Sequence, residues 1–127
     1  MPDAFIDANV LIHALRQGEA AWAAIRSIRA GGEALVHSIT IAELVAGAST
    51  RKELTAVQQM VSTFRHVVPD ESDIRRSLAL QERHALRHSV EWGDCVLAAT
   101  SMRLRVWVCT RDRHFAVLRG VRVIEPY

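Results

Sequence analysis

The stretch GDCVLAATSMRLRVWVCTRD, residues 93–112, decides the fold class. Residues 94–102 are apolar almost without interruption, which predicts a buried helix and not a surface helix. Residues 106–109 (VWVC) follow as a short apolar segment, typical of a parallel strand covered on both faces. Asp94 opens the helix, and Asp112 follows the strand. A buried helix that leads into such a strand indicates a right-handed crossover in a parallel sheet.

The same alternation of strands and helices extends through the rest of the chain. Short apolar runs predict further strands, and apolar residues at helical spacing predict helices between them. Strands alternating with helices imply a parallel sheet with helices on both faces, an α/β fold. We expect the remaining strands at residues 4–6, 34–37, 66–68 and 121–124, and helices at 9–15, 19–30, 40–47, around 54–64, from 70 to about 88, and near 114–118.

Length and composition favour one soluble domain over residues 1–127. A chain of 127 residues and 14.2 kDa has the size of one domain. Half of the residues are apolar and 24% are charged, which excludes a disordered chain. No apolar run approaches the roughly 20 residues needed to cross a bilayer, and the N-terminus lacks a secretory signal pattern. We therefore expect a cytoplasmic protein without a membrane partner, in which the two cysteines are buried apolar residues.

The basic residues are almost all arginine. Lys52 is the single lysine among 16 basic residues, and six arginines stand between residues 103 and 122 with one acid among them. Arginine matches phosphate oxygens with two parallel hydrogen bonds, whereas lysine does not. The pattern is compatible with a nucleic-acid partner, but a solvated face with an arginine-biased composition would look the same.

Four acids stand where the predicted topology places the carboxyl edge of the sheet. Asp7 directly follows the first strand, Glu43 lies in the first turn predicted for the helix after the second strand, and Asp112 follows the apolar strand. Asp94 reaches the same edge if its crossover is right-handed. Ligands of such sheets bind at this edge.

Each acid also has a purely structural explanation. Thr40 and Glu43 have the spacing of a capping box. Asp94 would be favoured in a first helical turn, and Asp7 and Asp112 could cap or terminate their neighbouring elements. Four carboxylates within about 4 Å would, however, repel by about 4 kcal/mol per pair at an effective dielectric of about 20. A divalent cation removes that repulsion, and carboxylate oxygens favour Mg²⁺ or Mn²⁺.

Such a metal site indicates phosphoryl chemistry, because a metal-bound water can attack a phosphodiester at neutral pH. Neighbouring hydroxyl and amide groups could orient the water or the acids. Arginines beside the last acid could hold phosphates that flank the reacting one. The orienting candidates are Asn9, Ser38, Thr40 and Thr110, and the phosphate-binding candidates are Arg111 and Arg113.

Four segments in order resemble the motifs of the PIN-domain family. FIDANVLIHAL (residues 5–15) resembles the opening motif, and SITIAELVAGA (38–48) resembles the second. GDCVLAATSMRLRVWVCTRDRHF (93–115) resembles the third motif joined to the fourth. GVRVIEP (120–126) resembles the C-terminal strand, and the length matches VapC-like toxins of type II toxin–antitoxin pairs.

This resemblance implies a three-layer α/β/α sandwich around a parallel sheet of about five strands. It also implies Mg²⁺- or Mn²⁺-dependent endoribonuclease activity on RNA, a homodimer, and a VapB-like antitoxin partner. Asp7, Glu43, Asp94 and Asp112 would form the acidic quartet, with catalytic and metal-binding roles. His114 stands where many members have another acid directly before the phenylalanine.

Two other functions fit parts of the pattern. A Mg²⁺-dependent phosphatase-like domain would share the acidic pocket, but such pockets usually need a second acid two residues after the first, where this chain has Asn9. A non-catalytic RNA- or protein-binding module on the same fold would need no metal, and the four intact acids argue against it. A measurement of metal binding would distinguish that module from both the nuclease and the phosphatase-like domain.

Overall fold

A computed structural model describes residues 2–87 and 89–127. Its strands form one sheet in the order β3-β2-β1-β4-β5, and every neighbouring pair is parallel. Because all strands run the same way, their carboxyl ends meet at one edge of the sheet. The predicted parallel α/β fold is confirmed. The strands are β1 (Ala4–Ile6), β2 (Ala34–His37), β3 (Arg65–Val67), β4 (Trp107–Cys109) and β5 (Val123–Ile124).

Helices fill the connections between the strands, close to their predicted positions. In the described part of the chain there are six α-helices and one short 3₁₀ helix, η1. None of these helices is both long and apolar enough to span a membrane. Their bounds are α1 (Ala8–Leu15), α2 (Glu19–Gly31), α3 (Ser38–Gly47), α4 (Arg51–Val61), α5 (Glu71–His84), α6 (Trp92–Leu104) and η1 (Arg113–Val117).

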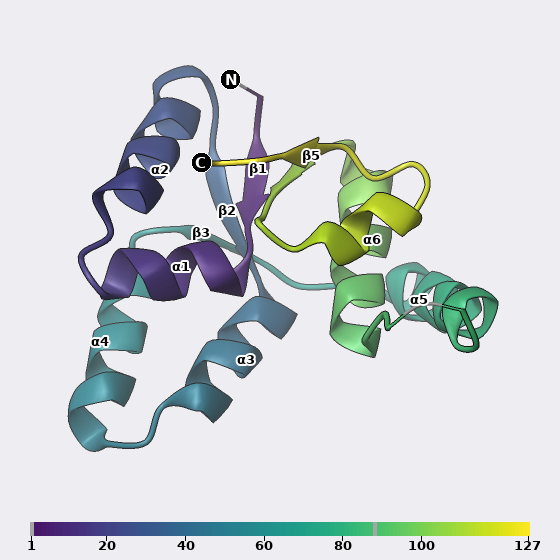
Figure 1. The fold of residues 1–127 in the computed structure, drawn as a ribbon, viewed down its shortest axis with the longest axis horizontal. Coiled ribbons are helices and arrows are strands. Elements are labelled where there is room, and N and C mark those ends of the chain that lie inside the picture. Colours follow the sequence, from purple (N-terminus) through teal and green to yellow (C-terminus); the bar gives the residue numbers. More distant parts are fainter. Residues whose placement is uncertain (1, 88) are drawn as a thin grey trace.

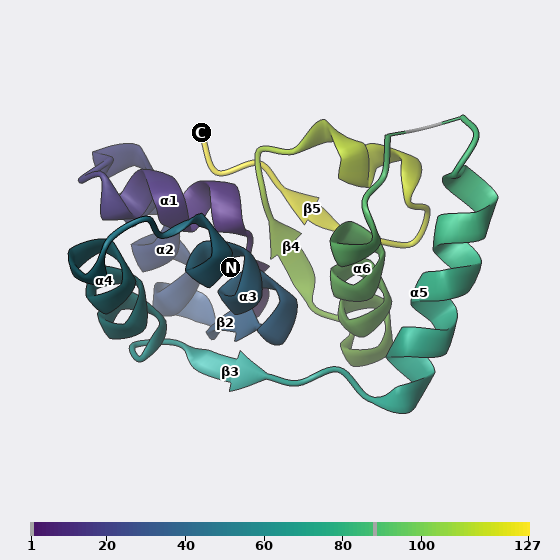
Figure 2. The same cartoon turned by 90° about the horizontal axis from the view of Figure 1, so that it is seen from below.

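Two apolar cores lie on opposite faces of the sheet. Ala4 and Ile6 of β1 face a core built with α1, α2, α3 and α4. Phe5, between them, faces a second core built with α5, α6 and η1. Figures 1 and 2 show α1 and α2 on one side of the sheet and α5 and α6 on the other. The arrangement is the expected three-layer α/β/α sandwich.

The edge strand β3 departs from the prediction that all strands are covered on both faces. Arg65 and His66 of β3 are exposed, and Val67 is half-buried. β3 pairs only with β2, so it lies at an open edge where polar side chains reach water.

The start of α3 also corrects the sequence interpretation. The helix begins at Ser38 and not at Thr40, because His37 is its N-cap and accepts the Ile39 N–H at Nδ1 over 3.0 Å. Thr40 therefore lies inside the helix, and Glu43 lies in the second turn instead of the first. The proposed capping box between Thr40 and Glu43 is wrong, which leaves the Glu43 carboxylate free for another role.

The long helix predicted from Asp70 to about residue 88 is shorter than expected. α5 begins after a capping box of Asp70 and Asp73, and it ends at His84. Position 88 lies outside the described residues. α5 packs along α6, and so supports the helix that carries Asp94 in its first turn.

Candidate functional site

Asp7 is the most deeply placed acid at the carboxyl edge of the sheet. It directly follows β1 and caps α1, where its Oδ1 accepts the Ala8 N–H over 2.8 Å. Its Oδ2 accepts the hydroxyl of Thr110, at the end of β4, over 2.7 Å. The residue is only 7% exposed. The predicted turn or cap role of Asp7 is therefore real, and the same carboxylate also faces the end of the neighbouring strand.

Thr110 and Asn9 connect Asp7 to the loop that carries Asp112. Asn9 Nδ2 donates to Thr110 Oγ1 over 3.1 Å, and its Oδ1 accepts the Arg111 N–H over 3.2 Å. Thr110 Oγ1 also accepts the Asp112 N–H over 2.9 Å. These bonds fix the loop after β4 against the start of α1, although the two segments are about a hundred residues apart in sequence.

Asp94, Asp112 and His114 form the tightest group of metal-binding side chains in the described residues. Each can offer one ligand atom, and these atoms lie within 4.8 Å of one another. Asp112 also caps η1 by accepting the His114 N–H over 2.8 Å, and its Oδ1 lies 3.3 Å from His114 Nδ1. The structure thus adds an imidazole to the predicted acids. Its signals in the sequence are its position two residues after Asp112 and its place directly before Phe115.

Glu43 reaches the same region from α3 and lies against the start of α6. A Cβ atom added to Gly93 would stand 2.8 Å from Glu43 Oε1, so the absence of a side chain there leaves room for this carboxylate. The two are close because α3 and α6 pack against each other. Figure 1 shows α3 starting below β2, beside the start of α1. Sequence reasoning missed Gly93, whose only signal was a residue without a side chain next to Asp94.

The pKa values of three of the acids are raised, in part by the negative charges of the other acids. Partial burial, followed by the charges of Asp7 and Asp94, raises the pKa of Glu43 to about 7. Burial, followed by the charges of Asp112 and Asp7, raises the pKa of Asp94 to about 6. Burial also raises the pKa of Asp7, although hydrogen bonds from Thr110 and Ala8 act in the opposite direction. Buried, mutually repelling carboxylates are the donor set that a hard divalent cation stabilises.

Of the six other predicted site residues, two contact the acids or one another, two lie exposed beside Asp112, and two point elsewhere. Asn9 and Thr110 join the acids as described, and Arg111 and Arg113 lie exposed on either side of Asp112. Ser38, by contrast, faces β3, where its Oγ lies 2.7 Å from His66 Nε2. Thr40 is buried within α3.

A buried polar chain supports the helices that carry Glu43 and Asp94. His37 is fully buried, and its Nε2 lies 2.9 Å from Thr100 Oγ1 on α6. Thr100 donates to Asp73 over 3.0 Å, and Arg103 makes two hydrogen bonds to the same carboxylate, of 2.8 and 2.9 Å. Because His37 Nδ1 accepts a backbone N–H, its proton sits on Nε2. Burial lowers the pKa of His37 to about 4, so the ring is neutral near pH 7.

A groove of about 430 Å³ opens beside Glu43 between α1, α3 and α4. Its apolar lining comes from all three helices, and charged groups stand at its rim. The apolar residues include Ile12, Leu15, Leu44, Ala56 and Val57, and the charged ones are Arg16, Glu43 and Glu53.

The model of the PIN domain family matches residues 4–121 of the chain. The chain belongs to the PIN domain family. The resemblance inferred from the four motifs is therefore confirmed. No curated protein sequence gives a significant match to this PIN domain.

Several solved structures share the fold of this PIN domain over nearly its whole length. A toxin–antitoxin complex from Klebsiella pneumoniae is 25% identical with a TM-score of 0.77, over 98% of both chains. DNA-bound VapBC from Salmonella typhimurium is 19% identical with a TM-score of 0.85, over 100% of both chains. FitAcB from Neisseria gonorrhoeae is 23% identical with a TM-score of 0.71, over 97% of both chains.

Proposed function

We propose that this PIN domain, acting as one unit over residues 1–127, is a metal-dependent endoribonuclease and the toxin of a VapBC-like pair. One observation carries the proposal: carboxylates from four separate segments gather at the carboxyl edge of a PIN-domain sheet, with the pKa of Glu43 and Asp94 raised to about 7 and 6. A cluster that repels itself when empty is suited to hold a cation.

The residues present fit a divalent metal. Asp7, Glu43, Asp94 and Asp112 would supply hard oxygen ligands for Mg²⁺ or Mn²⁺, and His114 lies within reach of the last two. The metal, when bound, would make hydroxide available near neutral pH and neutralise charge on a phosphodiester. Histidine and carboxylate ligands without a cysteine argue against a thiolate-bound structural zinc site.

The surrounding residues of the chain would orient the acids and the substrate. Thr110 donates to Asp7 Oδ2, as described above, and Asn9 Nδ2 donates to the same oxygen over 3.4 Å, which fixes the orientation of the carboxylate toward a metal. Arg111 and Arg113 flank Asp112 and would bind phosphates on either side of the scissile one. An RNA strand would therefore cross the edge of the sheet at the loop after β4.

An antitoxin partner is supported by the complexes that share this fold. We assign the groove beside Glu43 to an amphipathic helix of that antitoxin, because its apolar lining suits such a face and Glu43 is part of its lining. Binding there would place the antitoxin next to the site it must block. A homodimer and action on cytoplasmic RNA complete the proposal.

Cleavage of a labelled total-RNA pool by antitoxin-free protein tests the proposed activity. Wild type, Asp94→Asn and the charge-matched control Glu82→Gln, on an exposed face of α5, are compared with Mg²⁺ and with EDTA. Discrete fragments that require both the metal and Asp94, and that persist in Glu82→Gln, are expected. Fragments formed in EDTA, or equally by Asp94→Asn, would contradict the assignment.

Titration of the same proteins with Mg²⁺ covers the case of no cleavage. Saturable binding that Asp94→Asn weakens indicates a narrow substrate missing from the pool. No binding by wild type would refute the metal site and favour a non-catalytic module. A parallel lane of labelled single-stranded DNA separates a ribonuclease from a nuclease without sugar preference.

A further inference from the structure

Arg111 combines a fixed side chain with unused hydrogen-bond donors. Its guanidinium carbon lies 4.7 Å from the centroid of the Tyr127 ring, a stacking distance. In the part of the chain that the structure describes, this guanidinium has no ion pair and donates no hydrogen bond. Arg111 is also exposed. A guanidinium that stacks on a ring through one face and has all five N–H groups free can bind an anion with those donors.

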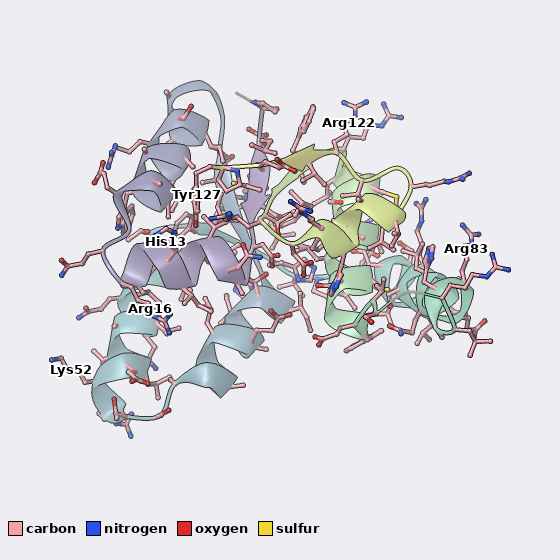
Figure 3. The ribbon with its side chains drawn as sticks, viewed as in Figure 1. His13, Arg16, Lys52, Arg83, Arg122 and Tyr127 are labelled. Atoms are coloured by element: carbon pink, nitrogen blue, oxygen red, sulfur yellow. The ribbon has the colours of Figure 1, made fainter. Side chains whose placement is uncertain are left out.

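Tyr127 is itself held in place by α1. Its hydroxyl lies 2.5 Å from His13 Nδ1, and the two rings meet edge to face with centroids 4.9 Å apart. Figure 3 shows the Tyr127 and His13 side chains next to each other over α1. The His13 ring fills the space above Gly18, where an added Cβ would stand 2.0 Å from His13 Cδ2. The phenol is therefore a positioned support, although its residue is 37% exposed.

This cluster adjoins the acidic site. The Arg111 backbone N–H donates to Asn9 Oδ1, and Asn9 in turn donates to Thr110, which donates to Asp7. The backbone of Arg111 is thus tied to the acids while its side chain lies on Tyr127. An anion bound by the guanidinium would lie beside the acids on the side of α1.

Most of the other arginines with contacts pair or hydrogen bond with polar groups, and Arg122 lies over the Trp107 ring at a longer distance of 5.8 Å. Arg26, Arg65, Arg75 and Arg103 pair with carboxylates. Arg29 stacks on Phe64 and also donates to Thr63. Of the arginines beside Asp112, Arg111 is the one with an aromatic support.

We propose that Tyr127, held by His13, positions Arg111 as a phosphate-binding subsite for the nucleotide next to the scissile phosphate of single-stranded RNA. The subsite rests on the proposed function. Arg111 is the phosphate ligand, and Tyr127 and His13 are positioning residues that act through it. A planar guanidinium binds two phosphate oxygens at once, and stacking reduces the freedom it must lose on binding.

Binding of a fluorescently labelled short single-stranded RNA tests the subsite without relying on cleavage. Fluorescence anisotropy is measured in EDTA, where metal-dependent hydrolysis is absent, over a series of salt concentrations. Arg111→Met is expected to weaken binding by about tenfold and to reduce the slope of log affinity against log salt by about 0.7. Arg83→Met, on α5 and far from α1 in Figure 3, removes the same charge and should leave the affinity within about twofold.

The tyrosine variants separate positioning from charge. Tyr127→Leu should weaken binding about fivefold with an unchanged salt slope, because the charge of Arg111 remains. Tyr127→Phe keeps the stacked ring but loses the hydroxyl that His13 holds, so it should weaken binding less than Tyr127→Leu does. Equal losses in Tyr127→Phe and Tyr127→Leu would refute support by the ring. Equal losses in Arg111→Met and Arg83→Met would refute the subsite.

Cleavage kinetics distinguish failure of the subsite from failure of the nuclease. In a cleaving protein, Arg111→Met and Tyr127→Leu should raise KM with little change in kcat, because they remove a contact to a phosphate that does not react and that is the same in the ground state and the transition state. Unchanged KM in both variants overturns the subsite and leaves the nuclease standing. Specific loss of RNA binding in Arg111→Met, in a protein that neither cleaves RNA nor binds Mg²⁺, supports Arg111 as the phosphate ligand and refutes the nuclease.

Discussion

Replacing Asp94 with asparagine should stabilise the metal-free protein while it abolishes metal-dependent cleavage. Burial and the charges of Asp112 and Asp7 raise the pKa of Asp94 from 3.8 to about 6. At about 1.36 kcal/mol per pKa unit this is about 3 kcal/mol, and partial exposure reduces it to about 1.5 kcal/mol. Losing a favourable acid in the first helical turn subtracts about 0.5 kcal/mol. The net gain of about 1 kcal/mol should raise Tm by about 4 °C.

The pH dependence has a definite sign. The folded pKa of Asp94 lies above its unfolded value, so the charged group destabilises the folded state above pH 6. The penalty fades as the pH falls below about 6 and is lost below 3.8, where the carboxyl is protonated in both states. The gain in folding stability of Asp94→Asn over wild type should therefore be largest above pH 6 and disappear in acid.

Adding Mg²⁺ should make wild type more stable than Asp94→Asn, the reverse of their order without metal. A cation that binds only the folded wild type adds about 2.7 kcal/mol at a concentration of 100 times Kd, and Asp94→Asn should gain much less. The assay is thermal unfolding with EDTA and with Mg²⁺ at several pH values, with Glu82→Gln as the control for lost charge. If Asp94→Asn is less stable than wild type in EDTA above pH 6, or if Mg²⁺ stabilises both equally, the acids do not share a metal-binding field.

Three further perturbations test the surrounding structure. Gly93→Ala should push the Glu43 carboxylate aside, since its Cβ would lie 2.8 Å from Oε1; Mg²⁺ affinity measured by titration should fall several-fold with little change in Tm. His37→Asn keeps a cap acceptor that does not titrate. The free energy of unfolding of wild type, relative to this variant, should therefore fall by up to about 3 kcal/mol as the pH drops from 6.5 to about 4. If urea unfolding shows the same difference at both pH values, the ring is not buried in its neutral form. Arg103→Met leaves the Asp73 carboxylate, which is 1% exposed, without its cation. In the same experiment the free energy of unfolding should fall by about 3 kcal/mol. A fall below about 1 kcal/mol would show that Asp73 needs no charged partner.

The fold was predictable because its signals are local. Short apolar runs between amphipathic helices predicted each strand to within a few residues, and the buried helix over 94–102 implied the crossover that brings Asp94 to the edge of the sheet. The weakest strand prediction was β3, whose exposed residues reflect its place at the sheet edge. Strand order is a long-range property, so no local pattern could have shown that position.

The candidate site was predictable in its acids and less so in its neighbours. Asp7 and Asp112 follow strands, and parallel strands deliver their carboxyl ends to one edge whatever their order. Ser38 directly follows β2 at the same edge, but its side chain faces His66 instead of the acids, because side-chain direction depends on how the helix leaves its strand. His114 gave little signal, since its place beside Asp94 results from the turn of η1.

The sequence by itself therefore determined the class of fold, the direction of its strands and the edge where the acids gather, because periodicity and connectivity encode these features along the chain. Only the tertiary structure decided which side chains meet there. His37 replaced Thr40 as the cap of α3, and Tyr127 came to rest on His13, a hydrogen bond between residues 114 positions apart. Such contacts depend on packing in three dimensions, and the sequence close to either residue carries no record of its partner.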